Sequence, residues 1–233
     1  MTMSINPFTE VKDYPSMRTK LGVLTFFWFL GGILVLQNTS PAIARMLAMV
    51  PAKTKIAGVE FGLATVLSAF AFAAVAYVAK LHDRVSDLFR IRARFDVDEI
   101  LKPSALATGT ELSPPQIQKL RTKRLELMWP VFYKFASSGR PVIDPHYITM
   151  ALTQWSWYWV VIELNVVVAL VCIGLFLASQ FLWLSMALAW LVLSFWLLQL
   201  IRNDCTTYAL QQIELIVSDP QRCAEISAVL RAL

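Results

Sequence analysis

The sequence predicts an all-α integral membrane protein, with four transmembrane helices arranged as two hairpins and a small helical cytosolic domain. Three observations lead to this fold class. The chain of 233 residues is 57% hydrophobic and only 16% charged, whereas a soluble domain of this length carries about a quarter charged residues. The apolar residues gather in four long runs, and the basic residues gather between the second run and the third. The chain is therefore too apolar for a soluble class.

The chain begins with a polar segment that we expect to be cytosolic, residues 1–20. The first transmembrane hairpin is expected over 21–79. Its first span, 21–36, contains no charged residue and is close to the shortest run that crosses the hydrocarbon, roughly 17 residues. A cleaved signal peptide is the competing interpretation, because Ala42 and Ala44 form an A-x-A motif just beyond the run. The long, partly acidic leading segment suits an export signal poorly and favours a retained helix.

A short amphipathic outer loop is expected between the first two spans. Ser40 followed by Pro41 is a typical helix start in this loop. The second span is expected over 57–79. Small residues at helical spacing along this span predict close packing against another helix: Gly58, Gly62, Ala69 and Ala76. The first span of the same chain or a second copy in an oligomer can supply that helix.

The basic cytosolic domain is expected over 80–150. No helix breaker separates Lys80 from the second span, so the sequence predicts that the helix continues out of the membrane. Apolar and polar residues then alternate over 89–97, and this pattern fits a strand as well as an Arg-rich helix. Ser113 and Gln116 form a capping box that predicts the start of another helix.

The second transmembrane hairpin is expected over 151–201, with cytosolic C-terminal helices over 202–233. Pro145 begins what the sequence predicts to be the longest helix. This helix passes through aromatic residues typical of a membrane–water boundary: Trp155, Trp157, Tyr158 and Trp159. A minimal turn at 178–180 separates the last two spans. We expect the centre and the tail to form one compact cytosolic domain.

Basic residues predict how the chain is threaded through the bilayer. Four spans place both termini on one side. The N-terminal segment, the centre and the tail together hold 18 of the 21 Lys and Arg residues, and the outer loop holds the other three. The positive-inside rule then places the termini and the centre in the cytoplasm. We expect a multi-pass protein of the bacterial inner membrane.

Polar residues inside the predicted spans are the leading candidate functional residues: Glu60, Glu163, Asn165 and Gln199. A carboxylate at the centre of a span costs about 3 kcal/mol unless it is paired or hydrated. Glu60 lies near the outer end of its span, where it can reach the interface or pair with Lys55. Glu163 has no Lys or Arg near it in sequence. It is expected to be protonated, to bond with Gln199 or Arg202, or to face water or the core of an oligomer, while Asn165 can join helices.

A basic surface is expected on the cytosolic domain: Arg90, Arg92, Arg94, Lys119, Arg121, Lys123 and Arg124. Three kinds of partner fit it, namely anionic lipid headgroups, a cytosolic protein, and a nucleotide or nucleic acid bound through its phosphates. Eight acidic residues in the same stretch leave a net charge of only +4. This low net charge argues against nucleic acid.

The sequence contains none of four motifs that are common in enzymes. It has no GxGxxG, GxxxxGK[ST], HExxH or GxSxG pattern, so we expect no enzymatic activity, no cofactor and no metal site. His82 and His146 lie at opposite ends of the centre and are interpreted as interfacial polar residues. The three cysteines show no metal or disulfide pattern and are expected to be reduced: Cys172, Cys205 and Cys223.

The layout resembles that of small bacterial four-span proteins with a cytosolic sensing segment, including membrane effectors of anti-phage defence systems. The resemblance covers span number and size, and it extends to no specific residue. It implies an oligomer that perturbs the membrane when a cytosolic partner signals. We therefore expect a channel-like or membrane-perturbing homo-oligomer gated at 80–150, with Glu163 facing the assembly core. The alternative is a membrane anchor or adaptor whose basic domain recruits a soluble protein or a nucleotide- or nucleic-acid-bound partner.

Overall fold

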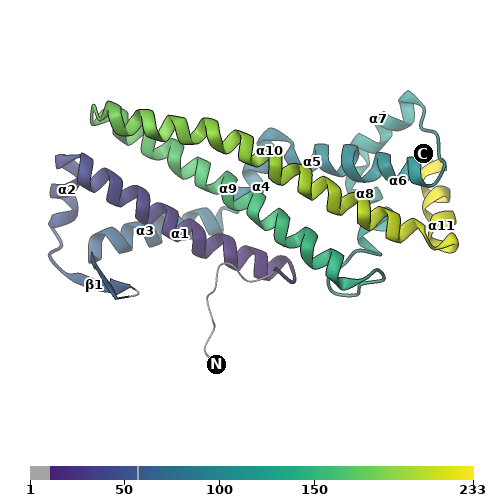
Figure 1. The fold of residues 1–233 in the computed structure, drawn as a ribbon, viewed down its shortest axis with the longest axis horizontal. Helices are drawn as coiled ribbons and strands as arrows, with labels where there is room; N and C mark the ends of the chain where they lie inside the picture. The colour runs from purple at the N-terminus through teal and green to yellow at the C-terminus, as the bar shows by residue number, and fades with distance from the viewer. Residues whose placement is uncertain (1–10, 57) are drawn as a thin grey trace. The chain divides into compact units, whose positions relative to one another are not determined.

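The computed structural model describes residues 11–56 and 58–233. This part of the chain is predominantly α-helical (Figure 1), with one short β-hairpin among the described residues. Contacts divide it into two compact units, each containing segments that are distant in sequence. The first unit contains Arg18–His82 and Ser156–Leu200, and the second contains residues 11–17, Asp83–Trp155 and Ile201–Leu233.

Three of the described helices are long and apolar enough to cross a membrane: α1 (Tyr14–Thr39), α9 (Pro145–Leu177) and α10 (Phe181–Val217). A fourth span is counted if α3 (Leu63–Val78) and α4 (Leu81–Phe89), which meet at a bend, form one span. The prediction of an all-α chain with membrane-spanning helices is confirmed at this level of length and composition.

The segment between the first two predicted spans contains a helix and a β-hairpin. Helix α2 (Pro41–Ala48) begins where the sequence predicted, because the Ser40 hydroxyl accepts a hydrogen bond from the Ile43 backbone N–H at 3.5 Å. Strands β1 (Lys53–Ile56) and β2 (Val59–Gly62) then pair antiparallel. Gly58 has φ +84° in the connection, a left-handed conformation that glycine adopts without steric cost.

The second span is shorter than predicted. The sequence predicted a helix from residue 57, which lies outside the described residues, but residues 59–62 form β2 and α3 begins at Leu63. Gly58 and Gly62 therefore do not lie on a helix, and their assignment to a helix-packing stripe is wrong. Glycine is unfavourable in a helix by about 1 kcal/mol relative to alanine, whereas the hairpin turn uses its freedom. Ala69 remains on α3 and is fully buried, and Ala76 is partly buried beside it.

The core of the first unit lies between α1, α3 and α9. Its buried residues are Phe29, Leu30, Ala69, Ala73 and Val167. Glycines bring α1 and α9 close together. A Cβ atom added at Gly32 would lie 2.8 Å from Val171 Cγ2, and one added at Gly174 would lie 2.7 Å from Leu36 Cδ2. These two helices therefore pack closely at Gly32 and Gly174, which were not among the packing residues predicted from the sequence.

The helix of the second span does not continue through Lys80, contrary to the prediction. Helix α3 ends at Val78, and Lys80 has φ 49° before α4 begins at Leu81. Arg90 has φ 52° and separates α4 from the next helix. Left-handed backbone is uncommon for residues other than glycine, so neither break had a signal in the sequence.

The second unit is built largely from short helices. Within the centre these are most of α4, α5 (Ile91–Phe95), the π-helix η1 (Asp96–Leu101), α6 (Lys102–Ala107), α7 (Pro114–Thr122), α8 (Arg124–Met128) and the π-helix η2 (Trp129–Tyr133). The segment 89–97, for which the sequence left strand and helix open, contains no strand and is helical except at Arg90. The predicted capping box is present, since Gln116 Oε1 accepts a hydrogen bond from the Ser113 backbone N–H at 2.9 Å.

The chain ends in a long helix and a short one. Helix α10 has 37 residues and α9 has 33, so the prediction that α9 is the longest helix is wrong. No Pro or Gly follows Ile201 until Pro220, and α10 continues to Val217. Helix α11 (Pro220–Arg231) begins at Asp219, whose Oδ1 accepts hydrogen bonds from two backbone N–H groups at 2.9 and 3.0 Å.

Candidate functional site around Glu163

Glu163 is buried in the first unit, where only 4% of it is exposed. It lies near the middle of α9. The Thr25 hydroxyl on α1 donates a hydrogen bond to Oε2, and Nδ1 of His82, at the start of α4, lies 3.3 Å from Oε1. His82 is only 6% exposed, and Thr25 is also buried. Each carboxylate oxygen therefore has a polar partner from a different helix.

These partners differ from those that the sequence suggested. Gln199 lies exposed on α10, and Arg202 belongs to the second unit, where Nη2 lies 3.3 Å from Glu99 Oε1. Thr25 is 138 positions from Glu163 in sequence. No local pattern could join such distant residues. His82, interpreted from the sequence as interfacial, is a buried partner of the carboxylate.

Two basic side chains of α1 lie in the same part of the first unit. The Arg18 guanidinium carbon is 4.5 Å from the centroid of the Tyr77 ring. The Lys20 ammonium donates a hydrogen bond to Ser156 Oγ at 3.0 Å and lies 3.9 Å from the centroid of a Trp157 ring. A desolvated cation over an aromatic ring is stabilised by about 2 kcal/mol. Trp157, one of the aromatic residues at the start of the third predicted span, thus contacts a cation of the protein itself.

A small cavity of about 10 Å³ adjoins the Glu163 side chain. It is lined by Arg18, Leu21, Gly22, Thr25, Ala73, Tyr77, His82 and Glu163. Its volume is at the lower limit for one water molecule, roughly 10 to 15 Å³. A carboxylate, an imidazole, a hydroxyl and a guanidinium therefore converge on one confined space between helices. These polar contacts can hold α1, α9 and the start of α4 together.

The remaining polar residues of the predicted spans lie outside this cluster. Glu60 is on β2 and half exposed, with Lys53 Nζ at 3.6 Å and Lys55 Nζ at 3.7 Å from its carboxylate oxygens. Its predicted place inside the second span is wrong, because the hairpin occupies that part of the chain. Asn165 is on α9, and its Oδ1 is buried without a hydrogen-bond partner in the described part of the chain.

The predicted basic surface is only partly a surface. Six of its seven members are exposed: Arg90, Arg92, Arg94, Lys119, Arg121 and Lys123. Arg124 is the exception, since its Nη1 lies 2.5 Å from Oδ2 of the buried Asp96. Its assignment to the surface is wrong, because the side chain points at a carboxylate in the interior of the second unit.

Asp96 and its neighbours form a second buried ionisable group. Burial raises the pKa of the Asp96 carboxyl above its ordinary value, although Arg124 beside it acts in the opposite direction. Among the described residues, no group of three His, Cys, Asp or Glu side chains is placed to hold a metal ion.

Comparison with known proteins gives one match. No curated protein and no solved structure matches the chain. The profile of the YmfE protein family matches residues 13–227, a range that includes Thr25, His82 and Glu163 as well as most of both units. The chain therefore belongs to the YmfE protein family.

Proposed function

We propose that this protein is an oligomeric, multi-span protein of the bacterial inner membrane that is channel-like or membrane-perturbing and is gated by a signal at its second unit. One observation carries the proposal. Glu163, His82 and Thr25 form a buried polar cluster between helices, two of which are long and apolar enough to span a membrane. Ionisable groups in such helices are costly and are therefore expected where function requires them.

In this proposal Glu163 acts inside one chain and does not line the centre of an oligomer. The sequence suggested the oligomer core because no partner was apparent. The structure supplies Thr25 and His82 as partners, and this removes the physical reason for that position. The carboxylate joins α1, α9 and the start of α4 through its contacts with Thr25 and His82. Loss of these contacts loosens the packing of the first unit.

The surface of α10 supports the oligomeric part of the proposal. Only 6% of the most apolar 18 residues of α10 are buried within the chain, against 39% for α9. Its exposed side chains include Trp183, Phe195 and Trp196. A helix with so few contacts in its own chain leaves its apolar surface to lipid and to other copies. The proposal assigns part of that surface to a second copy.

The proposed orientation places both termini and the second unit in the cytoplasm. Basic residues favour the cytoplasmic side, and 18 of the 21 Lys and Arg residues belong to the segments assigned there. This threading requires a membrane crossing at α3, which is counted as a candidate span only together with α4. An arrangement with three spans would place the termini on opposite sides.

Ion flux through proteoliposomes containing the full-length protein tests the gating proposal. Glu163→Gln replaces the buried carboxylate by an amide, and Glu60→Gln replaces a carboxylate of the exposed hairpin as a matched control. The first variant is expected to change the flux by about tenfold, which corresponds to about 1.4 kcal/mol in the gating equilibrium. The control is expected to match the wild type. Absence of flux from every oligomer, with Glu163→Gln indistinguishable from wild type in cells, refutes the proposal.

The resemblance in layout to anti-phage effectors supports one class of signal, an event in an infected cell. Plating efficiency of a phage panel on cells that express wild type or Glu163→Gln tests this part separately. Protection that depends on Glu163 supports a defence role. A lack of protection from phage, together with gated flux in liposomes, supports the gating proposal and contradicts the defence role.

An adaptor is the second candidate, and it is favoured by exposed apolar residues on the second unit. Leu125 and Trp129 are 74% and 62% exposed, and the exposed Arg121 precedes them in the last turn of α7. Trp and Arg are enriched among the residues that dominate protein interfaces. The test replaces the spans by unrelated transmembrane helices and compares this chain with Trp129→Ala. The adaptor is favoured over the gated oligomer if the protein's activity in cells survives the replacement of the spans and is lost in Trp129→Ala.

A further inference from the structure

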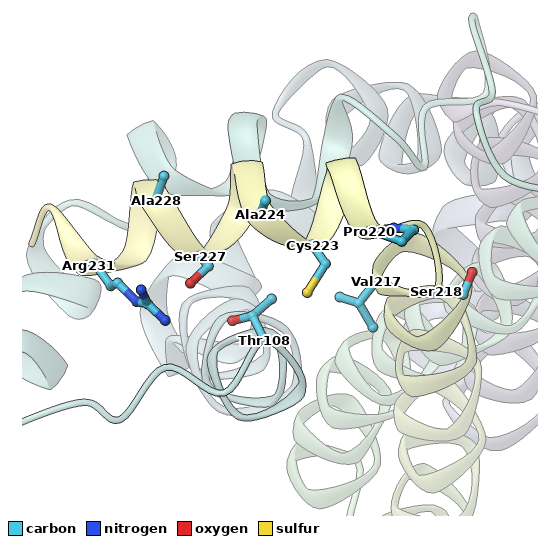
Figure 2. Close-up of a pocket in the computed structure, with 9 residues that line it drawn as sticks. All are labelled: Thr108, Val217, Ser218, Pro220, Cys223, Ala224, Ser227, Ala228 and Arg231. Carbon is cyan, nitrogen blue, oxygen red and sulfur yellow. The ribbon is translucent and has the colours of Figure 1, made fainter.

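A second, larger cavity lies within the second unit. It has a volume of about 500 Å³ and is lined by α11, the end of α10 and Thr108 at the end of α6 (Figure 2). This volume is in the range of small-molecule sites, about 300 to 1,000 Å³. The cavity is far larger than the space beside Glu163 and can hold more than solvent.

The lining combines a small apolar wall with polar groups. Ala224 and Ala228 of α11 leave room beside the helix because their side chains are short. The Cys223 thiol points from α11 toward Thr108 (Figure 2), and the Ser227 hydroxyl on the same helix lies 3.1 Å from Thr110 Oγ1. The Thr108 hydroxyl donates to the Ser104 carbonyl at 3.0 Å and lies 3.2 Å from Thr110 Oγ1, so its oxygen keeps one lone pair that can accept a hydrogen bond from a ligand.

The charge of the lining is entirely positive. Arg231 is its only charged residue, and no Asp or Glu is among the residues that line it. Other basic residues of the second unit are paired, for example Arg124 with Asp96 and Arg202 with Glu99. Within the described part of the chain, no ion pair occupies Arg231.

Arg231 lies in the last turn of α11, where the helix dipole carries a partial negative charge. That charge is about half an elementary charge and falls off within one turn, whereas the guanidinium carries a full positive charge and presents donors that match phosphate and carboxylate oxygens. The guanidinium therefore dominates, and the end of the cavity near Arg231 attracts an anion.

We propose that this cavity binds a small molecule that carries a phosphate or carboxylate group together with hydroxyl groups. The anion binds Arg231, and the hydroxyls donate to Thr108 and Ser227 along the short-chain wall of α11. The same chemistry is offered by a free phosphorylated metabolite and by the phosphoglycerol headgroup of an anionic lipid. The inference does not depend on the gating proposed above.

Cys223 provides a reporter of occupancy, because its thiol lines the cavity. Full-length protein in phosphatidylcholine nanodiscs is treated with iodoacetamide, and alkylation of Cys223 is quantified by peptide mass spectrometry. The probes are inorganic phosphate, glycerol 3-phosphate and citrate. A second set of nanodiscs contains phosphatidylglycerol and no added probe. A ligand at about four times its dissociation constant is expected to slow alkylation about fivefold, because about one fifth of the sites stay empty.

Three variants make the result specific. Arg231→Gln removes the anion partner and is expected to abolish protection. Arg121→Gln removes an exposed charge of α7 that does not line the cavity and is expected to keep protection. Ala228→Leu fills the cavity without altering its charge and is also expected to abolish protection. Cys205 is buried, so its continued resistance to alkylation shows that each variant is folded.

Each outcome bears on the inference. Protection by phosphate-bearing probes that requires Arg231 supports a free anionic ligand, and protection found only with phosphatidylglycerol supports a lipid headgroup. Absence of protection with every probe and in both kinds of nanodisc overturns the inference. Protection that remains in the folded Arg231→Gln and Ala228→Leu variants overturns it as well.

Discussion

Buried carboxylates at Glu163 and Asp96 each have a partner from a distant part of the chain. Glu163 contacts Thr25 and His82, and Asp96 contacts Arg124. Removing one member of a buried ion pair costs about 3 to 5 kcal/mol, because it leaves the other group unpaired, whereas replacing both by apolar residues is often neutral. At the scale of residues, these two contacts are where single substitutions are expected to have large effects.

The pH dependence of stability tests the burial of Asp96. The pKa of Asp96 is raised in the folded chain above its ordinary 3.8, so the unfolded chain ionises first as the pH rises. Protonated Asp96 therefore favours folding below the ordinary pKa, and this contribution is lost as the pH rises through the raised folded pKa. The stability of wild type relative to Asp96→Asn is expected to fall over this interval. Chemical unfolding of both chains in detergent, at a series of pH values, measures it.

Asp96→Asn is the suitable reference for this measurement because its side chain stays neutral at every pH. Other titrating groups contribute equally to both chains and cancel in the difference. A relative stability of wild type that rises with pH would mean that pairing with Arg124 outweighs burial, and would contradict the raised pKa.

The sequence was sufficient to select Glu163 but not to find its partners. A carboxylate inside an apolar run is visible without a structure, because its cost in hydrocarbon is general. Thr25 and His82 gave no such signal, since a threonine and a histidine are common at helix ends and interfaces. Arg124 was assigned to a surface because it lies in a basic run, and only the fold shows that Asp96 faces it.

Among the elements, the starts of several helices could be predicted from capping residues in the sequence, whereas the breaks between helices could not. Ser40, Ser113 and Asp219 begin helices through their own side chains, and such caps are readable in sequence. Lys80 and Arg90 interrupt helices with left-handed backbone, and neither residue type predicts that conformation. The β-hairpin was missed for a related reason, because Gly58 and Gly62 fit a helix-packing stripe as well as a turn.

Adjacent glycines of α1 provide a matched test of its packing against α9. A Cβ added at Gly32 would lie 2.8 Å from Val171 Cγ2, whereas one added at Gly31 meets no atom within 4 Å. Gly32→Ala is expected to lower the unfolding free energy by about 1 to 3 kcal/mol, because overpacking forces stiff neighbours to move. Gly31→Ala is expected to be neutral or to stabilise by up to about 1 kcal/mol through helix propensity. Thermal unfolding in detergent compares the two, and equal effects would contradict the close approach.

Each of the two units has its own buried apolar residues. The first unit has an apolar core with one polar cluster. The second buries Leu101, Leu120 and Ile226 completely, and partly exposed ion pairs also join its centre to the tail, namely Lys134 with Glu225 and Glu99 with Arg202. The sequence predicted that centre and tail fold together, because both are polar segments on one side of the predicted spans. Residues 11–17, which were assigned to a separate N-terminal segment, belong to the same unit.

A double-mutant cycle measures whether His82 and Glu163 act as one unit inside a single chain. His82→Phe and Glu163→Met keep the approximate volume of each side chain and remove its polar groups. Unfolding free energy in detergent and ion flux in liposomes are measured for wild type, both single variants and the double variant. If the two side chains are coupled, each single variant is expected to be destabilised by about 3 kcal/mol, and the double variant is expected to be close to wild type in stability.

The flux measurements are expected to follow the same pattern of coupling, with gating lost to the same extent in all three variants. Effects on stability that add within about 0.5 kcal/mol, the behaviour of independent sites, would contradict the account.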